Sequence, residues 1–505
     1  MGRITAPICD FVRKYRDSGM IRMHMPGHKG RSFLGPEDLD ITEIAGADAL
    51  YEASGIIRES EQNASALFGT QATFYGTEGS SQMIRAMLYL AGAWAREKER
   101  ENAASGRITI LAARNVHKSF VQACALLDYD VNWLYGEEAS YLSCRIGPET
   151  LEKALQSAPA LPDAFFITSP DYLGKTADIR ALSAVCRKYG VPMLVDNAHG
   201  AYLHFLPEPQ HPMDLSADLC CDSAHKTLPV LTGGAYLHVA AAGEAAACEE
   251  GTGTAELRRK MRRFFAENAR SALALFGSTS PSYLILQSLD LCDVYLVSGY
   301  RGKLSDFTAR LQELKVRLLH AGVPFAASEP LKLTLEDPAV SCGLSGNELA
   351  AFLRQNGVEC EFSDAEHLVL MLSPENTEQE LSKLEALLTG CFSKAGERGE
   401  ARLRKPETAE SVSCRESRKF GEASEDQEAP EAPEASEKVL SIREAVFSAH
   451  ETIPVTEAEG RIAGAPTVSC PPAVPIVISG ERISRRAVES FRHFGIETVE
   501  VVREC

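Results

Sequence analysis

The chain has little that would suit binding to nucleic acid. Asp and Glu together number 70 against 52 for Lys and Arg, which gives a net charge of −18 at pH 7. A surface this acidic repels phosphate backbones, and no basic segment is interleaved with aromatic residues. The composition therefore disfavours a nucleic-acid partner. A cationic small substrate would suit the charge, although solubility alone also explains it.

Long hydrophobic runs and paired cysteine motifs are also missing. One of the longest uncharged stretches, residues 271–289, contains Gly, Pro, Thr, Gln and several Ser, so we do not expect it to span a membrane. The 14 cysteines include no Cys-x-x-Cys pair, and no signal peptide precedes them, a pattern typical of reduced thiols. We therefore expect a soluble, cytoplasmic protein with no membrane partner.

A change of composition divides the chain near its C-terminal end. Within residues 394–440 the apolar periodicity disappears, and residues 421–438 carry seven acids, one base and no large apolar residue. Such a segment cannot bury enough surface to offset the entropy lost on ordering. It is predicted to be a disordered acidic linker, followed by a small C-terminal module at 441–505.

The part before the linker predicts a large α/β domain and a smaller α+β domain. Short apolar strands alternate with helices, which favours a mainly parallel sheet covered on both faces. We expect strands at 108–112, 164–168, 193–195, 218–221 and 235–239, and helices at 82–99, 148–157 and 179–189. The predicted organisation is an N-terminal arm at 1–60, a large domain at 61–300 and a smaller α+β domain at 301–393.

Ligands of parallel sheets bind at the carboxyl ends of the strands, and a polar Gly/Ser segment precedes the helix predicted at 82–99. In Gly76–Gln82 (GTEGSSQ) the glycines, the hydroxyls and the start of the helix would form a cradle for an anion, most often phosphate. The spacing matches neither the P-loop nor the dinucleotide fingerprint. Taken alone, a Ser-rich helix cap without a ligand explains this segment better.

Three further strand ends carry candidate residues, and each has a purely structural explanation as well. His117 could stack on a ring or bind a metal, or simply lie in a loop. Asp196 closes an apolar strand, so its carboxylate needs a cationic partner. Asp196 and His199 could together ligate a metal ion. No third ligand lies at a recognisable spacing, however, so no metal is expected. Lys226, between an apolar strand and a Gly-rich turn, could be a nucleophile with a lowered pKa or a surface lysine.

Together the four segments fit one ligand, pyridoxal 5′-phosphate. The cradle would hold the phosphate and His117 would cover the ring. Asp196 would pair with the pyridine nitrogen, and Lys226 would form the Schiff base.

Several motifs match one enzyme family in order and spacing. They are HMPGHKG at 24–30, DITEIAGAD at 40–48, GSSQ at 79–82, RNVHKS at 114–119, SPDYLG at 169–174, DNAHG at 196–200, SAHK at 223–226, TSPSY at 279–283, GRI at 460–462 and PP at 471–472. With them the chain resembles the ornithine/lysine/arginine decarboxylase family of pyridoxal-phosphate enzymes, in the aspartate-aminotransferase fold superfamily. The likeness is to the short bacterial members without an N-terminal wing domain.

The resemblance implies the fold type I architecture: a large domain with a mainly parallel sheet, a smaller α+β domain and a C-terminal module. It implies that Lys226, His117 and His199 are catalytic. It also implies a set of residues that contact the cofactor: Ser80, Ser81, His117, Asp196, His199, Ser223, His225, Lys226 and Ser278. The family forms homodimers or larger homo-oligomers, in which Ser278 and residues 25–30 would serve the partner's site.

The activity implied is decarboxylation of a basic amino acid (arginine, lysine or ornithine) to its amine, a polyamine precursor. Transamination or aldol cleavage on the same cofactor, or a cofactor-binding protein that has lost turnover, remain alternatives. One departure concerns the substrate: the acidic residue that the family would place near the distal cationic group falls on Ala465. Asp48 and Asp171, both inside matching motifs, are candidate replacements.

Overall fold

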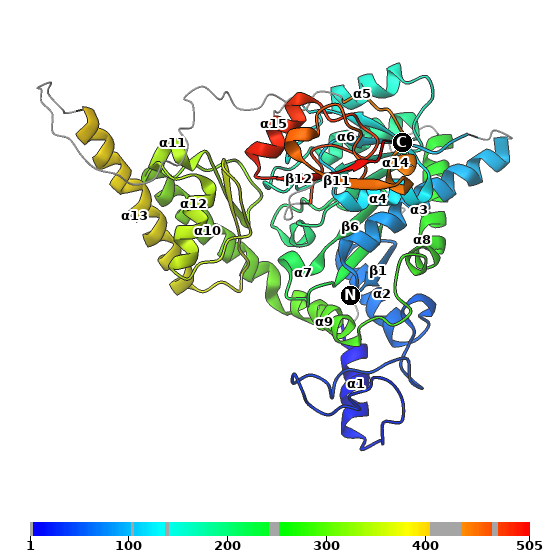
Figure 1. The fold of residues 1–505 in the computed structure, drawn as a ribbon. Helices are drawn as coiled ribbons and strands as arrows, with labels where there is room; N and C mark the ends of the chain where they lie inside the picture. Colours follow the sequence, from blue (N-terminus) through cyan, green and yellow to red (C-terminus); the bar gives the residue numbers. More distant parts are fainter. Residues whose placement is uncertain are drawn as a thin grey trace, which may run out of the picture.

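The computed structural model describes residues 4–102, 106–136, 141–241, 252–403, 436–466 and 473–504. A large domain forms the centre of the molecule, the small domain lies to one side and the C-terminal module packs on the large domain (Figure 1). Across these ranges, no helix combines the length and the apolar character needed to cross a membrane.

A seven-stranded sheet in the order β1-β7-β6-β5-β4-β2-β3 is the core of the large domain. Its strands are β1 (Ala72–Gly76), β2 (Thr109–Ala113), β3 (Asp130–Leu134), β4 (Ala164–Thr168), β5 (Met193–Asp196), β6 (Leu219–Asp222) and β7 (Ala235–Val239). The pairs β3–β2, β2–β4, β4–β5 and β5–β6 are parallel, whereas β7 is antiparallel to both of its neighbours. The prediction of a mainly parallel sheet is confirmed, and β1 and β3 are additional to the predicted strands.

The strands are apolar because helices cover both faces of the sheet, so successive side chains enter different cores. In β4, Phe166 packs in one core, while Phe165 and Ile167 pack in the other. The first core includes side chains of α3 (Gly79–Asn102), α4 (Lys118–Leu127) and α8 (Thr252–Ala274). The second includes side chains of α5 (Pro148–Ser157) and α6 (Ile179–Tyr189), two helices with the predicted bounds.

The small domain contains a three-stranded antiparallel sheet in the order β8-β10-β9. Its elements are α10 (Arg301–His320), β8 (Lys332–Glu336), α11 (Pro338–Cys342), α12 (Gly346–Gln355), β9 (Phe362–Ser363), β10 (His367–Met371) and α13 (Glu378–Leu403). The position predicted as the start of the linker, residue 394, lies inside α13. Residues 404–435 of the predicted linker lie outside the described residues.

The two ends of the chain pack on different sides of the large domain (Figure 1). In the N-terminal part, α1 (Pro7–Asp17) and α2 (Ile56–Phe68) pack against α9 (Tyr283–Tyr295). The C-terminal module comprises α14 (Ile442–Phe447), β11 (His450–Pro454), α15 (Arg485–His493) and β12 (Thr498–Val502), and α14 packs on α4. The remaining short elements are η1 (Leu50–Glu52), η2 (Ala201–Phe205), α7 (Ala224–Thr227), η4 (Leu296–Tyr300) and η5 (Val455–Glu457).

Candidate active site

A cavity of about 310 Å³ lies at the carboxyl ends of the strands. Residues that follow β1, β2, β4, β5 and β6 line it, and Val474 reaches it from beyond the C-terminal module's first strand. Eight of the nine residues expected to contact the cofactor are among the lining residues: Ser80, Ser81, His117, Asp196, His199, Ser223, His225 and Lys226. The ninth, Ser278, is an exposed residue outside this lining, and its backbone N–H donates to the carboxylate of Glu78, which does line the cavity.

One end of the cavity gathers hydroxyl groups at the start of α3. Gly79 has φ +69°, a left-handed conformation that favours glycine. The Ser223 hydroxyl donates to Ser80 Oγ at 2.8 Å, and the Ser119 hydroxyl donates to Ser81 Oγ at 2.8 Å. The first turns of α3 and α4 and the residue before α7 therefore bring hydroxyls to the positive end of a long helix, a combination that can hold a phosphate group.

Asp196 ends β5 and is buried. Its Oδ1 accepts the backbone N–H of Ala198 at 3.2 Å, and the Cys221 thiol lies 3.7 Å from the same oxygen. Burial raises the pKa of Asp196 to about 6, although the positive charge of Lys226 opposes the shift. A buried carboxylate of this kind is stabilised by a cationic partner, and a protonated pyridine nitrogen would be one.

Lys226 lies in α7, where its Nζ is 2.9 Å from Nε2 of His199. Burial lowers the pKa of Lys226 below its ordinary value, while the charges of Asp196 and Glu361 oppose that change. Burial and then the charge of Lys226 hold the pKa of His199 well below its ordinary value. His199 is therefore neutral near pH 7, and the lysine amine is closer to its nucleophilic, uncharged form than a surface lysine would be.

The other two histidines in the cavity are held by backbone groups. Nδ1 of His117 accepts the N–H of Ser119 at 3.2 Å, so the proton of the neutral ring is on Nε2. Burial, followed by the charge of Lys226, lowers the pKa of His117 to about 4. Nδ1 of His225 lies 3.0 Å from the carbonyl oxygen of Gly234 and donates to it.

Several lining residues have buried polar atoms without a hydrogen-bond partner in the described part of the chain. They are Oδ1 of Asn115, Oγ1 of Thr168 and Nδ1 of His199. Buried polar atoms are normally paired, so these atoms fit a polar ligand in the cavity.

Sequence reasoning missed part of the lining. The other site residues were predicted from their positions at the ends of strands. The same criterion could have identified Glu78, Thr168 and Tyr172, because they lie at or just after the ends of β1 and β4. Val474 follows no strand end, and nothing in its local sequence indicates that it reaches the cavity.

The two acids considered as substitutes for the missing carboxylate have other partners. The carboxylate of Asp48 accepts backbone N–H groups from Ser54, Gly55 and Ile57. Asp171 is buried and accepts the N–H of Lys175 at 2.9 Å. Neither residue is among those that line the cavity, and neither is Ala465.

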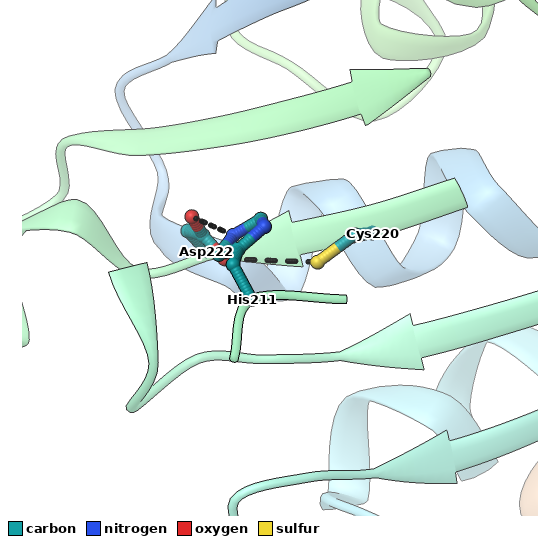
Figure 2. Close-up of side chains that lie close together, drawn as sticks. All are labelled: His211, Cys220 and Asp222. Atoms are coloured by element: carbon teal, nitrogen blue, oxygen red, sulfur yellow. Dashed lines mark hydrogen bonds and ion pairs between the residues drawn. The ribbon is translucent and has the colours of Figure 1, made fainter. Parts of the chain in front are cut away.

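A buried network lies directly behind the cavity. Asp222, at the end of β6, accepts hydrogen bonds from Nε2 of His211 and of His238, each at 3.0 Å, and from Nδ2 of Asn197 at 2.7 Å. Figure 2 shows His211 and Asp222 with Cys220, whose thiol is 3.7 Å from Oδ1 of Asp222. Burial alone would raise the pKa of Asp222, but the two histidines outweigh it and hold the pKa well below its usual range.

The three side chains in Figure 2 have the donor types of a metal site. The backbone N–H of Met213, however, donates to Nδ1 of His211 at 3.2 Å. The proton of that ring must then be on Nε2, where it is donated to Asp222. The cluster is therefore a satisfied hydrogen-bond network, because ligation through Nε2 would require the other tautomer and break the bond to Met213.

Two family models match the chain. Residues 6–321 match "Orn/Lys/Arg decarboxylase, major domain", and residues 427–498 match "Orn/Lys/Arg decarboxylase, C-terminal domain". The chain therefore belongs to the Orn/Lys/Arg decarboxylase family, whose members are pyridoxal-phosphate-dependent lyases. Pyridoxal 5′-phosphate is its cofactor, and the hydroxyl cradle, buried carboxylate and buried lysine of the cavity fit that molecule.

Individual relatives agree with this assignment. An uncharacterized protein of Bacillus subtilis, YaaO, is 28% identical over 92% of this chain and 89% of its own length. The arginine decarboxylase of the same organism is 26% identical over 97% of this chain and 93% of its own length. The lysine decarboxylase LdcF of Francisella novicida superposes with a TM-score of 0.72 at 15% identity, covering 99% of this chain and 81% of that one. The fold type I architecture is thereby confirmed.

Proposed function

We propose that this protein decarboxylates arginine, lysine or ornithine to the corresponding amine, a polyamine precursor. The observation that carries the proposal is a buried lysine amine in one cavity with a buried carboxylate and a hydroxyl-lined helix start. The family description and the name of the Bacillus subtilis arginine decarboxylase support a basic amino acid as substrate. When bound, pyridoxal phosphate supplies an electron sink for the electron pair left at Cα as carbon dioxide departs.

The residues at the two ends of the cavity would bind and orient the cofactor. Ser80, Ser81 and Ser223 would contact the phosphate, and Asp196 would accept a hydrogen bond from the protonated pyridine nitrogen. Because Asp196 is buried, its charge is little screened, and it would keep the proton on the ring. His117, neutral and fixed by Ser119, would cover the ring without adding charge.

Lys226 and His199 would handle the protons at the reacting carbon. Lys226 is the residue that would hold the cofactor covalently, through its amine. In the protein, Lys226 Nζ is within hydrogen-bond distance of the neutral His199 Nε2. Either group can hold the proton that replaces the lost carboxylate at Cα.

We also propose that the active form is a homodimer. The N-terminal arm exposes a group of large apolar side chains: Met20, Ile21, Met23, Met25, Phe33 and Leu34, with exposed fractions between 61% and 92%. An apolar surface of this kind on a folded protein marks an interaction site. The same arm includes residues 25–30, which the family resemblance assigns to the partner's site.

A product assay tests the reaction. Purified protein with added pyridoxal phosphate should release carbon dioxide and the matching amine from at least one of the three amino acids, and Lys226→Ala should release neither. Lys153→Ala, an exposed lysine on α5, is the matched control and should keep full activity. A keto acid in place of the amine would indicate transamination, and no product from any of the three would favour a protein that has lost turnover.

A further inference from the structure

The proposed substrates carry a positive charge far from the reacting carbon, and a carboxylate should meet it. Of the acids near the cavity, Asp196 would be occupied by the pyridine nitrogen. Glu78 lies beside the hydroxyl cradle and accepts the N–H of Ser278. Asp48 and Asp171 are bound by backbone amides, as described above. The acid that recognises the distal charge therefore has to come from another element.

A line of contacts leads from Lys226 to such an acid in the small domain. Lys226 Nζ is 2.9 Å from His199 Nε2, and the His199 ring lies edge-on to the Tyr172 ring with centroids 5.3 Å apart. The Tyr172 hydroxyl, in turn, donates to Oε1 of Glu361 at 2.8 Å. Tyr172 lines the cavity, and Glu361, which is not itself a lining residue, is one hydrogen bond away from that lining.

Glu361 is held in place but remains accessible. Its backbone N–H donates to the carbonyl oxygen of Val369 in β10 at 3.0 Å. The next residue, Phe362, is buried and packs edge-on against Tyr172, with centroids 5.4 Å apart and an interplanar angle of 88°. The Glu361 residue itself is exposed. Its negative charge reaches the reacting centre, because it helps to raise the pKa of Lys226 against the effect of burial.

We propose that Glu361, with one oxygen held by the Tyr172 hydroxyl, binds the distal ammonium or guanidinium group of the substrate. It would take over the task of the carboxylate that is missing at Ala465. This inference rests on the proposed function, since it assigns the substrate contact of that same cavity. A carboxylate directly before β9, with its backbone bonded to β10 and one oxygen held by a tyrosine hydroxyl, provides a preorganised partner for a cation.

The test compares Glu361→Gln with wild type on the best basic substrate and on its uncharged analogue: citrulline for arginine, norleucine for lysine or norvaline for ornithine. Gln keeps the acceptor for Tyr172 and removes the charge, so the fold should be unaffected. We expect kcat/KM for the basic substrate to fall on the order of 30-fold or more, mainly through KM. The value for the uncharged analogue should not fall, so the preference between the two should shrink by the same factor.

The matched control is Glu359→Gln, which changes an exposed glutamate two residues away that pairs with Arg354 at 2.7 Å on the surface. It should leave both values unchanged. An unchanged preference in Glu361→Gln, or a loss of preference in Glu78→Gln instead, would overturn the proposal.

A second measurement separates this inference from the proposed function. Titration of the cofactor's visible spectrum with each amino acid gives a dissociation constant without turnover. If wild type binds a basic amino acid but releases no carbon dioxide, the proposed function fails, and the titration of Glu361→Gln still decides the role of Glu361. If wild type binds the basic amino acid no better than its uncharged analogue, the inference about Glu361 is contradicted.

Discussion

Two carboxylates end neighbouring strands and behave in opposite ways, and the difference lies in their partners. Asp196 is buried with one backbone donor and a thiol, and its pKa is raised to about 6. Asp222 is equally buried but receives hydrogen bonds from two histidines and an asparagine, and its pKa is lowered. The ionised form of Asp196 is destabilised in the protein alone, so this carboxylate fits a cationic ligand. The ionised form of Asp222 already has its hydrogen-bond donors within the protein.

This contrast predicts stability changes of opposite sign in the cofactor-free protein. A raised carboxyl pKa means that the ionised form costs stability, and this cost appears as the pH rises from about 4 to about 6. Asp196→Asn should therefore be more stable than wild type at about pH 8, by about 1–3 kcal/mol, and the gain should shrink toward pH 5. The variant should also bind pyridoxal phosphate more weakly. Urea unfolding at both pH values measures the first effect.

Asp222→Asn should lose stability under the same conditions. A lowered carboxyl pKa contributes stability that is present above the unfolded value near pH 4 and lost as the pH falls further. Replacing the charge leaves His211 and His238 facing an amide, so the loss at about pH 8 should be about 3–5 kcal/mol. Equal losses in Asp196→Asn and Asp222→Asn would contradict the assignment of different roles to the two residues.

At the scale of elements, the strand ends were predictable and the edges of the sheet were not. The five predicted strands read as short apolar runs, and four of them are followed by cavity residues. The edge strand β3 has the sequence DVNWL, in which Asp130 is partly exposed and Asn132 is exposed, so it lacks the continuous apolar pattern of a buried strand. Val474 and Glu361 join the cavity region only through packing of the C-terminal module and the small domain, and no local sequence pattern encodes such long-range contacts.

The turn at Gly233 contacts the cradle so closely that a side chain at this position would clash with the backbone. Gly233 has φ +100°, its carbonyl oxygen accepts the N–H of Gly79, and a Cβ at Gly233 would lie 2.6 Å from the carbonyl oxygen of Thr77. Gly233→Ala should displace the cradle and weaken binding of pyridoxal phosphate by about tenfold or more. Fluorescence titration with the cofactor measures the change.

Gly19→Ala is the matched control, because Gly19 has φ +70° and no atom within 4 Å of a Cβ. It should cost only the conformational strain, about 1–2 kcal/mol of stability, and leave cofactor binding unchanged. Equal cofactor affinity in the two variants would show that the Gly233 turn does not set the shape of the cradle.

At the scale of the whole molecule, the arm around α1 extends from the large domain with its apolar residues exposed (Figure 1). Light scattering should give a mass of about twice 54.9 kDa or a larger multiple. The double variant Met23→Glu, Phe33→Glu should shift the protein to monomers, because burying two charges in an interface is costly. The control is Val340→Glu, because Val340 on α11 is 88% exposed, the same fraction as Met23. This variant should not shift the protein to monomers. A monomeric wild type would contradict the dimer proposal.

The measurement that tests the central claim most directly is reductive trapping of the cofactor. The protein is incubated with pyridoxal phosphate, reduced with borohydride and digested, and the modified peptide is identified by mass spectrometry. Because Lys226 lines the same cavity as the hydroxyl cradle and Asp196, the pyridoxyl group should be found on Lys226, and Lys226→Ala should carry no label. A label on a different lysine, or a protein that takes up no cofactor, would contradict the account of this cavity as the active site.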